Sequence, residues 1–430
     1  MKKRILGCLL AGFLSLSAVS QVSSTLSPYS QFGIGALAEQ SQGFNRGMAG
    51  LSIGMRGGNV VNMQNPASYS AVDSLTMIFD VGVSGQLNHF TEGGTTVNTK
   101  TGNFDYAVTS FRLLRNLGLS AGVVPYSNIG YNYYNSDYIG NSATYMNEIH
   151  EGSGGFSQVF LGVGWRIFKG FSAGVNVSYF WGDWERSVTV VNSDSYVNTV
   201  TKNYDSEVTS YKLDFGLQWQ QRLGKEWQMT LGAIYGLGHS LGNSADMTVT
   251  NLNKQTSEAN IDVETVGNAL SIPHTFGAGV SLTKGRGLTF GADYTMQKWA
   301  ELSYPAYSAE ANSYRLTDGL LRDRHKVVVG ADWIPNPQGR KSLLQHIHYR
   351  IGASYATPYY KIKGGDGPKE LTVSAGFGVP VINSWNNRSV LNISASWVRT
   401  AAPGMLVDNS FRLSLGLTFN ERWFAKWKVD

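Results

Sequence analysis

Few residues in this chain have the types and spacing that catalysis or metal binding requires. His346 and His348 lie two positions apart, so on a β-strand both imidazoles would face one side, next to Arg350. Two imidazoles can share a metal ion, but no cysteine and no obvious third ligand is adjacent. We therefore expect these side chains to fill a polar interior, and we predict no metal site.

Catalytic motifs are equally scarce. The stretch GSGG at 152–155 has the glycines of a phosphate loop but lacks the Lys-Ser/Thr pair that follows in one. No GxSxG nucleophile elbow and no convincing pair of carboxylates is present. A Ser–His arrangement at the edge of a lumen is left open, although no motif points to it. The sequence thus predicts a protein that is not an enzyme and that binds no cofactor.

Composition favours a membrane barrel. Charged residues make up 15% of the 430 residues, against about 25% in typical soluble domains, and there are 50 glycines and 12% aromatics. Beyond the first 20 residues no apolar run approaches the roughly 18 residues of a membrane helix. A chain of this kind that spans a membrane would do so with strands.

The first 20 residues are typical of a Sec-type signal peptide. Basic residues at 2–4 precede an apolar run over 5–16, and Ala18-Val19-Ser20 provides the small residues of a cleavage site before Gln21. The single cysteine, Cys8, lies inside this segment. Without the three basic residues at 2–4, 32 basic and 30 acidic residues leave a net charge of +2. Since no basic run follows, we expect no nucleic-acid binding.

Alternation with a period of two dominates the rest of the chain. Phe79, Val81 and Val83 share one face of a strand, and Asp80 and Gly82 share the other. Fourteen such segments begin near residues 75, 103, 116, 154, 170, 208, 226, 273, 287, 323, 345, 369, 388 and 409. Long and short connections alternate between them, as in outer-membrane proteins with extracellular loops and periplasmic turns. We predict an all-β fold, a 14-stranded antiparallel transmembrane β-barrel over residues 75–420, followed by a periplasmic tail over 421–430.

Residues 21–74 do not alternate. They are rich in glycine, but they also carry more apolar residues than a disordered leader would. A compact N-terminal hatch, or plug, inside the barrel lumen explains both properties. A barrel of 14 strands would otherwise leave an open interior.

Several motifs in this order resemble the FadL family of outer-membrane transport proteins. They are Asn65-Pro66-Ala67 after the predicted hatch, IP at 272–273, YRIG at 349–352 and GFGVP at 376–380. The resemblance covers nearly the whole mature chain and implies location in the outer membrane. It implies passive uptake of hydrophobic small molecules, such as long-chain fatty acids, which leave sideways into the outer-membrane lipid through a kink in the third strand.

The resemblance directs attention to two groups of residues. The third predicted strand contains Gly122, Pro125 and Gly130, and a proline in a closed barrel wall favours a bulge or kink over a regular strand. The alternative is that Pro125 ends the strand early at the rim. Candidate residues for an apolar ligand pocket are Phe32, Ile34, Phe44, Met48, Phe160 and Phe180.

Two features disagree with uptake of lipids. The inward faces of the predicted strands are mostly Gly, Ser, Asn, Gln and Asp, whereas a long hydrophobic ligand needs a mostly apolar pocket. The stretch YSQFGIG at 29–35 also departs from a typical transporter hatch. Some FadL-like barrels are instead subunits of protein secretion systems, including type IX secretion, or of outer-membrane assembly machinery. The alternative function is therefore an accessory barrel whose partners are other subunits of an outer-membrane complex.

Overall fold

The structure is a computed structural model that describes residues 27–139, 144–308, 310–337, 343–381 and 389–421. The predicted signal peptide and the predicted tail beyond residue 421 lie outside the described residues. Within those ranges, no helix is long and apolar enough to cross a membrane.

The described chain forms a closed antiparallel barrel of 14 strands, which confirms the predicted fold class. Each strand pairs with its neighbours in sequence order, and pairing of the first strand with the last closes the wall. Its strands are β2 (Met77–Glu92), β3 (Thr95–Leu114), β4 (Leu117–Tyr138), β5 (Tyr145–Phe168), β6 (Phe171–Asn192), β7 (Thr199–Leu223), β8 (Trp227–Gly236), β13 (Thr275–Lys284), β14 (Leu288–Gln297), β17 (Arg324–Trp333), β18 (His348–Ala356), β21 (Lys369–Val381), β22 (Ser389–Ala401) and β23 (Val407–Glu421).

The alternation in the sequence corresponds to the two faces of the wall. On β2, Val81, Val83 and Leu87 are exposed on the outer face, while Ser84 and Gln86 are buried inside. Because each Cβ along a strand points to the opposite side from the one before, a period of two is enough to separate a lipid-facing surface from a polar interior.

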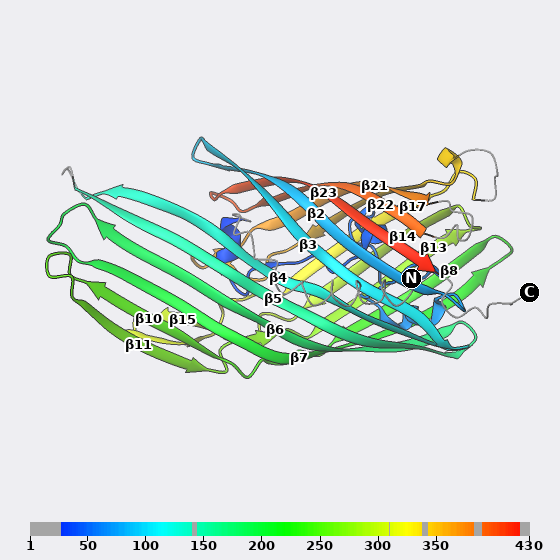
Figure 1. The fold of residues 1–430 in the computed structure, drawn as a ribbon, viewed down its shortest axis with the longest axis horizontal. Helices are drawn as coiled ribbons and strands as arrows, with labels where there is room; N and C mark the ends of the chain where they lie inside the picture. Colours follow the sequence, from blue (N-terminus) through cyan, green and yellow to red (C-terminus); the bar gives the residue numbers. More distant parts are fainter. Residues whose placement is uncertain (1–26, 140–143, 309, 338–342, 382–388, 422–430) are drawn as a thin grey trace, which may run out of the picture.

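Four strands are much longer than a bilayer requires. Strands β4 to β7 have 22 to 25 residues, whereas about 9 to 11 residues cross the hydrocarbon core. These strands extend beyond the others on the side of the long loops, which is the extracellular side. Strand β10 (Ser244–Leu252) pairs with the upper part of β7, and β11 (Ala259–Gly267) pairs with β10. Figure 1 shows this extracellular wall projecting beyond the rest of the barrel.

Short elements line the inner side of the extracellular wall. The hairpin of β15 (Tyr304–Ser308) and β16 (Ser313–Thr317) contacts β11, and Tyr314 packs against Tyr204 of β7. Two further pairs lie at the extracellular end of the barrel, and they are formed by β9 (His239–Ser240) with β12 (Ser271–Ile272) and by β19 (Lys361–Ile362) with β20 (Gly365–Asp366).

Residues 27–74, here called the N-terminal segment, contact the inner face of the wall on several sides. The segment contains η2 (Pro28–Gln31), β1 (Ala36–Leu37), α2 (Gly43–Arg46) and η3 (Pro66–Ala71). Helix α2 packs against β21, β22, β23 and β2, while η3 packs against β3 to β7. In Figure 1 the segment, in dark blue, lies within the ring of strands.

Inward-facing glycines allow this close packing. A Cβ at Gly232 of β8 would overlap the carbonyl of Ile53, and one at Gly118 of β4 would overlap the carbonyl of Tyr69. Backbone of the N-terminal segment therefore lies directly on backbone of the wall. The packing explains why glycine occupies inward positions on barrel strands, where it is otherwise unfavourable.

We predict that Gly232→Val displaces the N-terminal segment locally and lowers barrel stability by about 1–3 kcal/mol, because an overpacked interior must shift. The measurement is the temperature at which the gel band of the folded, purified barrel shifts to the position of the unfolded chain. Gly85→Val is the matched control, since Gly85 is an outward-facing strand residue whose Cβ would meet no atom within 4 Å. Equal midpoints for the two variants would contradict the prediction.

Candidate functional site

The barrel wall is not evenly paired between β3 and β4. Their ladder runs from Leu114↔Leu117 up to Ala107↔Val123 and stops there. Above that point β3 pairs only with β2 among the barrel strands, and β4 pairs only with β5. We call this interval, formed by residues 95–106 of β3 and 124–138 of β4, the seam.

Irregular pairing marks both sides of the seam where it begins. On β4 the register with β5 shifts between Pro125 and Ser127, and on β3 the register with β2 skips Asp105. Proline has no N–H to donate to a ladder, and an extra residue bends and twists a strand. These two irregularities account for the divergence of β3 from β4.

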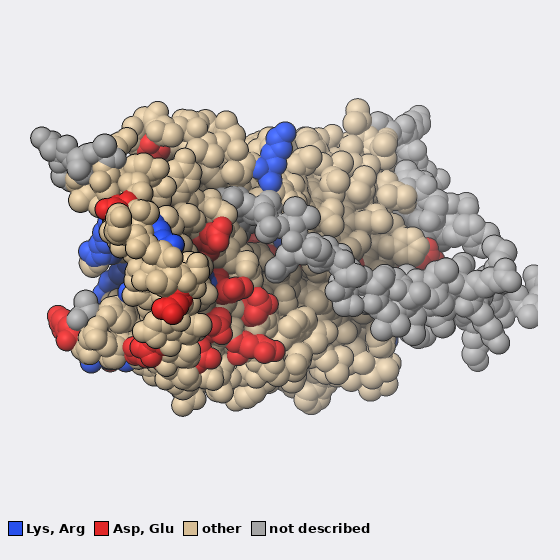
Figure 2. All heavy atoms as spheres, turned by 60° about the vertical axis from the view of Figure 1, so that its left-hand side comes forward, with Lys and Arg blue, Asp and Glu red and all other residues tan. Residues whose placement is uncertain are grey.

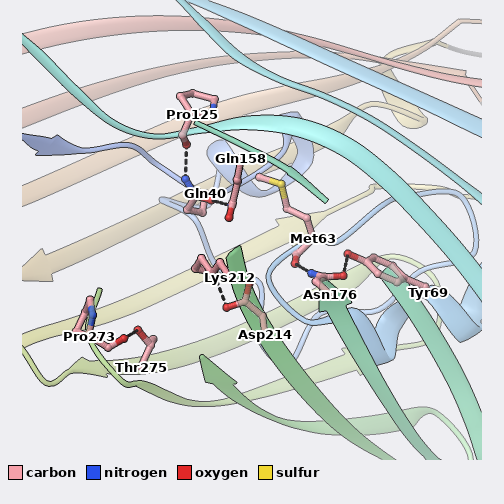
Figure 3. A network of polar contacts seen from close by, with 10 residues as sticks. All are labelled: Gln40, Met63, Tyr69, Pro125, Gln158, Asn176, Lys212, Asp214, Pro273 and Thr275. Atoms are coloured by element: carbon pink, nitrogen blue, oxygen red, sulfur yellow. Dashed lines mark hydrogen bonds and ion pairs between the residues drawn. The ribbon is translucent and has the colours of Figure 1, made fainter. Parts of the chain in front are cut away.

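The N-terminal segment covers the edge of β4 that β3 leaves. Strand β1 pairs antiparallel with it, with Leu37 opposite Ser127, and the Ala38 N–H donates to the Tyr126 carbonyl at 2.9 Å. The Gln40 side chain donates to the Pro125 carbonyl at 2.5 Å and accepts from Gln158 at 3.0 Å (Figure 3). The wall is thus completed by a strand that lies inside the barrel.

Higher on the same edge, Gly130 exchanges hydrogen bonds with η2. Its carbonyl accepts from the Ser27 N–H at 3.4 Å, and its N–H donates to the Ser30 hydroxyl at 3.2 Å. Gly122 lies below the seam and pairs with Val108 on one side and Phe160 on the other. Of the three residues of the predicted kink, Pro125 and Gly130 therefore contact the N-terminal segment, and Gly122 belongs to the regular wall.

Two adjoining cavities lie between the N-terminal segment and the wall, and charged residues line them. Glu39 pairs with Lys326 at 2.7 Å, and Arg46 pairs with Asp105 at 3.1 Å. Lys212 and Asp214 form a third pair deeper in the lumen (Figure 3). Arg412 borders both cavities. Ion pairs and apolar side chains such as Leu37 and Phe160 therefore both line the space behind the seam.

The six apolar candidates lie mainly in packed clusters beside the cavities. Phe44 and Met48 pack with Leu51, Met55 and Val328. Ile34 and Phe180 belong to a cluster at the extracellular mouth, where Phe32 stacks on Tyr360 with ring centroids 5.1 Å apart. Phe160 packs in a third cluster and also borders the larger cavity. The structure does not bring the six residues together around one space.

Aromatic side chains fill the extracellular mouth. Tyr359 donates hydrogen bonds to the carbonyls of Phe32 and Gly35, and Tyr304 donates to the Gly33 carbonyl at 2.9 Å. The cluster around them includes Tyr126, Tyr131, Phe156, Trp184, Trp299, Tyr314 and Tyr360. Sequence reasoning missed this closure, although the many Tyr and Trp residues in the long connections were a signal for it.

A hydrogen bond from the Tyr29 hydroxyl also helps to close the extracellular mouth. Burial, with a smaller contribution from Glu92, raises the pKa of Tyr29 to about 12. Its hydroxyl donates to the carbonyl of Leu406. This bond joins the start of the N-terminal segment to the last extracellular loop.

The motif Asn65-Pro66-Ala67 lies at the other end of the N-terminal segment. The Asn65 side chain caps η3 by accepting from the Ala67 N–H at 3.2 Å, and it donates to the carbonyls of Ile53 and Leu217. A Cβ at Gly174 or Gly216 would contact Pro66. The motif therefore fixes η3 against β5 to β7, on a different part of the wall from Pro125.

The two histidines of the sequence analysis do not form a pair on one strand. Strand β18 begins at His348, and His346 lies before it, so the expectation of a shared face is wrong. His348 contacts Asp332 at 2.8 Å, and Arg350 contacts the same carboxylate at 3.3 Å. Among the described residues, no group of three or more His, Cys, Asp or Glu side chains could hold a metal ion.

A family model described as BamG matches residues 1–430. The chain belongs to the BamG family. No curated protein matches this BamG-family chain.

Solved structures with the same fold are FadL-type channels. The Pseudomonas putida toluene transporter TodX is 13% identical, with 91% of this chain and 100% of TodX covered and a TM-score of 0.61. A Pseudomonas aeruginosa FadL homologue is 13% identical over 90% and 98% of the two chains, with a TM-score of 0.60. The Ralstonia pickettii toluene transporter TbuX is 11% identical over 88% and 98%, with a TM-score of 0.56. This BamG-family protein therefore has the barrel fold of these channels.

We predict that the variant Leu37→Cys/Ser127→Cys forms a disulfide in the cell envelope. The two residues are opposite each other in the non-hydrogen-bonded position of the β1–β4 pair, where Cα atoms approach to about 4.5 Å. We expect most of the protein to be oxidised, as measured by thiol labelling before and after reduction. The two single variants are controls, and free thiols in the double variant would show that β1 does not lie on β4.

Proposed function

We propose that this BamG-family barrel is a non-transporting accessory subunit of an outer-membrane protein assembly or secretion complex. The observation that carries the proposal is the occupied seam, where the chain's own backbone covers β4 and ion pairs lie behind it. In this conformation the wall and the lumen serve to hold the N-terminal segment.

The energetics of a hydrophobic ligand support this role. A hydrocarbon that entered beside the seam would remove water from Glu39, Lys326, Arg46 and Asp105 without replacing it by any hydrogen bond. Desolvating ionised groups in this way is costly, and ligand sites for apolar molecules are mainly apolar instead. The six candidate side chains are packed in apolar clusters, and of these six only Phe160 borders either of the two described cavities.

The external surfaces agree with a role in a complex. Strands β5 to β7 with β10 and β11 raise a wall well beyond the bilayer, which a channel for small molecules does not need. The match to the BamG family also favours association with an outer-membrane complex.

We predict that purification of the tagged full-length protein in mild detergent recovers other outer-membrane proteins in fixed stoichiometry. Size-exclusion chromatography followed by mass spectrometry of a single peak is the measurement. An unrelated tagged outer-membrane barrel, expressed at the same level, controls for co-solubilisation. Recovery of this chain alone would count against the accessory role.

Passive uptake of hydrophobic molecules is the second candidate, and the seam itself favours it. The β3–β4 ladder ends in the third barrel strand, where the resemblance to FadL proteins places a lateral exit. The structural neighbours TodX and TbuX are toluene transporters. For uptake to occur, β1 would have to leave β4.

The disulfide variant Leu37→Cys/Ser127→Cys separates the two candidates. We expect cells with the oxidised variant to take up labelled toluene or oleate at the same rate as cells with the reduced variant, because we infer no transport through the seam. Uptake is measured before and after reduction in the same cells, with each single cysteine variant as control. Uptake that falls on oxidation and recovers on reduction would establish the transport function instead.

A further inference from the structure

Three arginines meet at the periplasmic end of the N-terminal segment. Arg56 belongs to that segment, Arg112 lies near the end of β3, and Arg166 lies near the end of β5. All three bind the last residues of η3. Arg56 donates to the Ser70 hydroxyl at 2.9 Å, Arg166 to the Ser70 carbonyl at 3.1 Å, and Arg112 to the Ala71 carbonyl at 3.3 Å.

These three arginines have fewer carboxylates beside them than positive charges. In the described part of the chain, no ion pair of 4.0 Å or less joins any of the three to a carboxylate, although the Asp73 carboxylate lies close enough to Arg112 to interact with its charge. Arg112 and Arg166 each make one side-chain hydrogen bond, although a guanidinium carries five N–H donors. The buried Nε of Arg112 has no acceptor. Three like charges with unused donors are a site that favours an anion.

The rim around the arginines is also basic. Exposed cations lie at the periplasmic ends of β7 and β13 and in the turns after β3, β5, β7 and β13, and one exposed carboxylate, Glu226, lies among them. The exposed cations are Arg115, Lys169, Arg222, Lys225, Lys284 and Arg286. Glu226 pairs with Lys284 at 3.7 Å, which leaves the rest of this rim positive.

The opposite end of the molecule has the opposite charge. Asp183 lies across from Glu207, and Glu185 across from Asp205, on the outer face of the extracellular wall. Figure 2 shows Asp and Glu side chains gathered on that end, together with several Lys and Arg side chains. Burial and the nearby Asp246 raise the pKa of Asp205. Carboxylates therefore face one another on the extracellular wall, whereas exposed cations outnumber exposed carboxylates at the described periplasmic turns.

The position of the arginines decides what can reach them. Arg112 shares the inward face of β3 with Val108 and Ser110, and Arg166 shares the inward face of β5 with Gly162 and Gly164. The barrel wall thus separates the cluster from lipid headgroups, and Arg56, Arg112 and Arg166 are each partly exposed at its periplasmic end. An extended segment with several carboxylates fits such a mouth, because arginine forms paired hydrogen bonds with carboxylates.

We propose that the basic periplasmic mouth docks an acidic segment of a periplasmic partner protein, with Arg112 and Arg166 at its centre. The proposal rests on the accessory role and adds to it the face and the charge of the partner. Electrostatic docking of this type speeds association and is weakened by salt.

The test uses the full-length protein in detergent and a fluorescent poly-glutamate peptide. We expect the wild type to bind the peptide, with affinity that falls as salt rises, and Arg112→Gln/Arg166→Gln to bind about tenfold more weakly, a loss of about 1.4 kcal/mol. Arg315→Gln/Lys361→Gln, which removes two exposed cations from extracellular hairpins, is the matched control. Equal binding by the wild type and the Arg112/Arg166 variant would overturn the proposal.

A second pair of variants separates charge from folding. Arg112→Lys/Arg166→Lys keeps the positive charge and should retain most of the binding, and both double variants should keep the heat-dependent gel mobility of a folded barrel. Flotation with phosphatidylglycerol vesicles tests the alternative ligand. Loss of flotation with unchanged peptide binding would assign the arginines to lipid and overturn the proposal.

The same variants distinguish failure of this inference from failure of the accessory role. If the complex is recovered in mild detergent with both the wild type and Arg112→Gln/Arg166→Gln, with the same sensitivity to salt, the partner docks elsewhere and the accessory role stands. If the wild type is recovered alone, the accessory role fails. Loss of the complex in the glutamine variant and its retention in the lysine variant support the docking surface.

Discussion

Hydrogen bonding between β1 and the open edge of β4 is the interaction on which the rest of this structure depends. Every backbone N–H and C=O at the depth of a membrane needs a partner, because no water is present in the hydrocarbon to supply one. Strand β3 leaves β4 above Val123, so a length of β4 loses its neighbour. Residues 36–38 supply the missing partner from inside. The N-terminal segment is therefore part of the wall as well as a filling of the lumen.

Two other features follow from that arrangement. The N-terminal segment is held against β4, and it also contacts the opposite strands of the barrel. Glycines such as Gly232 and Gly352 let its backbone lie directly on those strands. The polar groups it carries must be neutralised in the lumen, which Lys326 does for Glu39 and Asp105 does for Arg46. Breaking one member of a buried pair leaves an uncompensated charge, so these pairs also resist release of the segment.

The chain's own residues fill much of the interior of this FadL-type fold. In this BamG-family chain the seam is covered, ion pairs and apolar side chains line the cavities, and the mouth is closed by aromatic packing. These properties agree with a scaffold that presents its two ends to partners. The ends differ in charge, with carboxylates on the extracellular wall and arginines at the periplasmic mouth.

Strand alternation and the spacing of turns were enough to determine the barrel and its 14 strands, because the face of a strand residue depends on its position alone. The interruption at Pro125 was also visible locally, since proline cannot donate to a ladder. Tertiary structure decided what fills the seam, because residues 36–38 meet residues 126–128 only when the chain is folded. It also decided that the apolar candidates pack among themselves and that Arg56, Arg112 and Arg166, distant in sequence, surround one turn at Ser70. Such contacts depend on the closure of the whole wall, which no local pattern encodes.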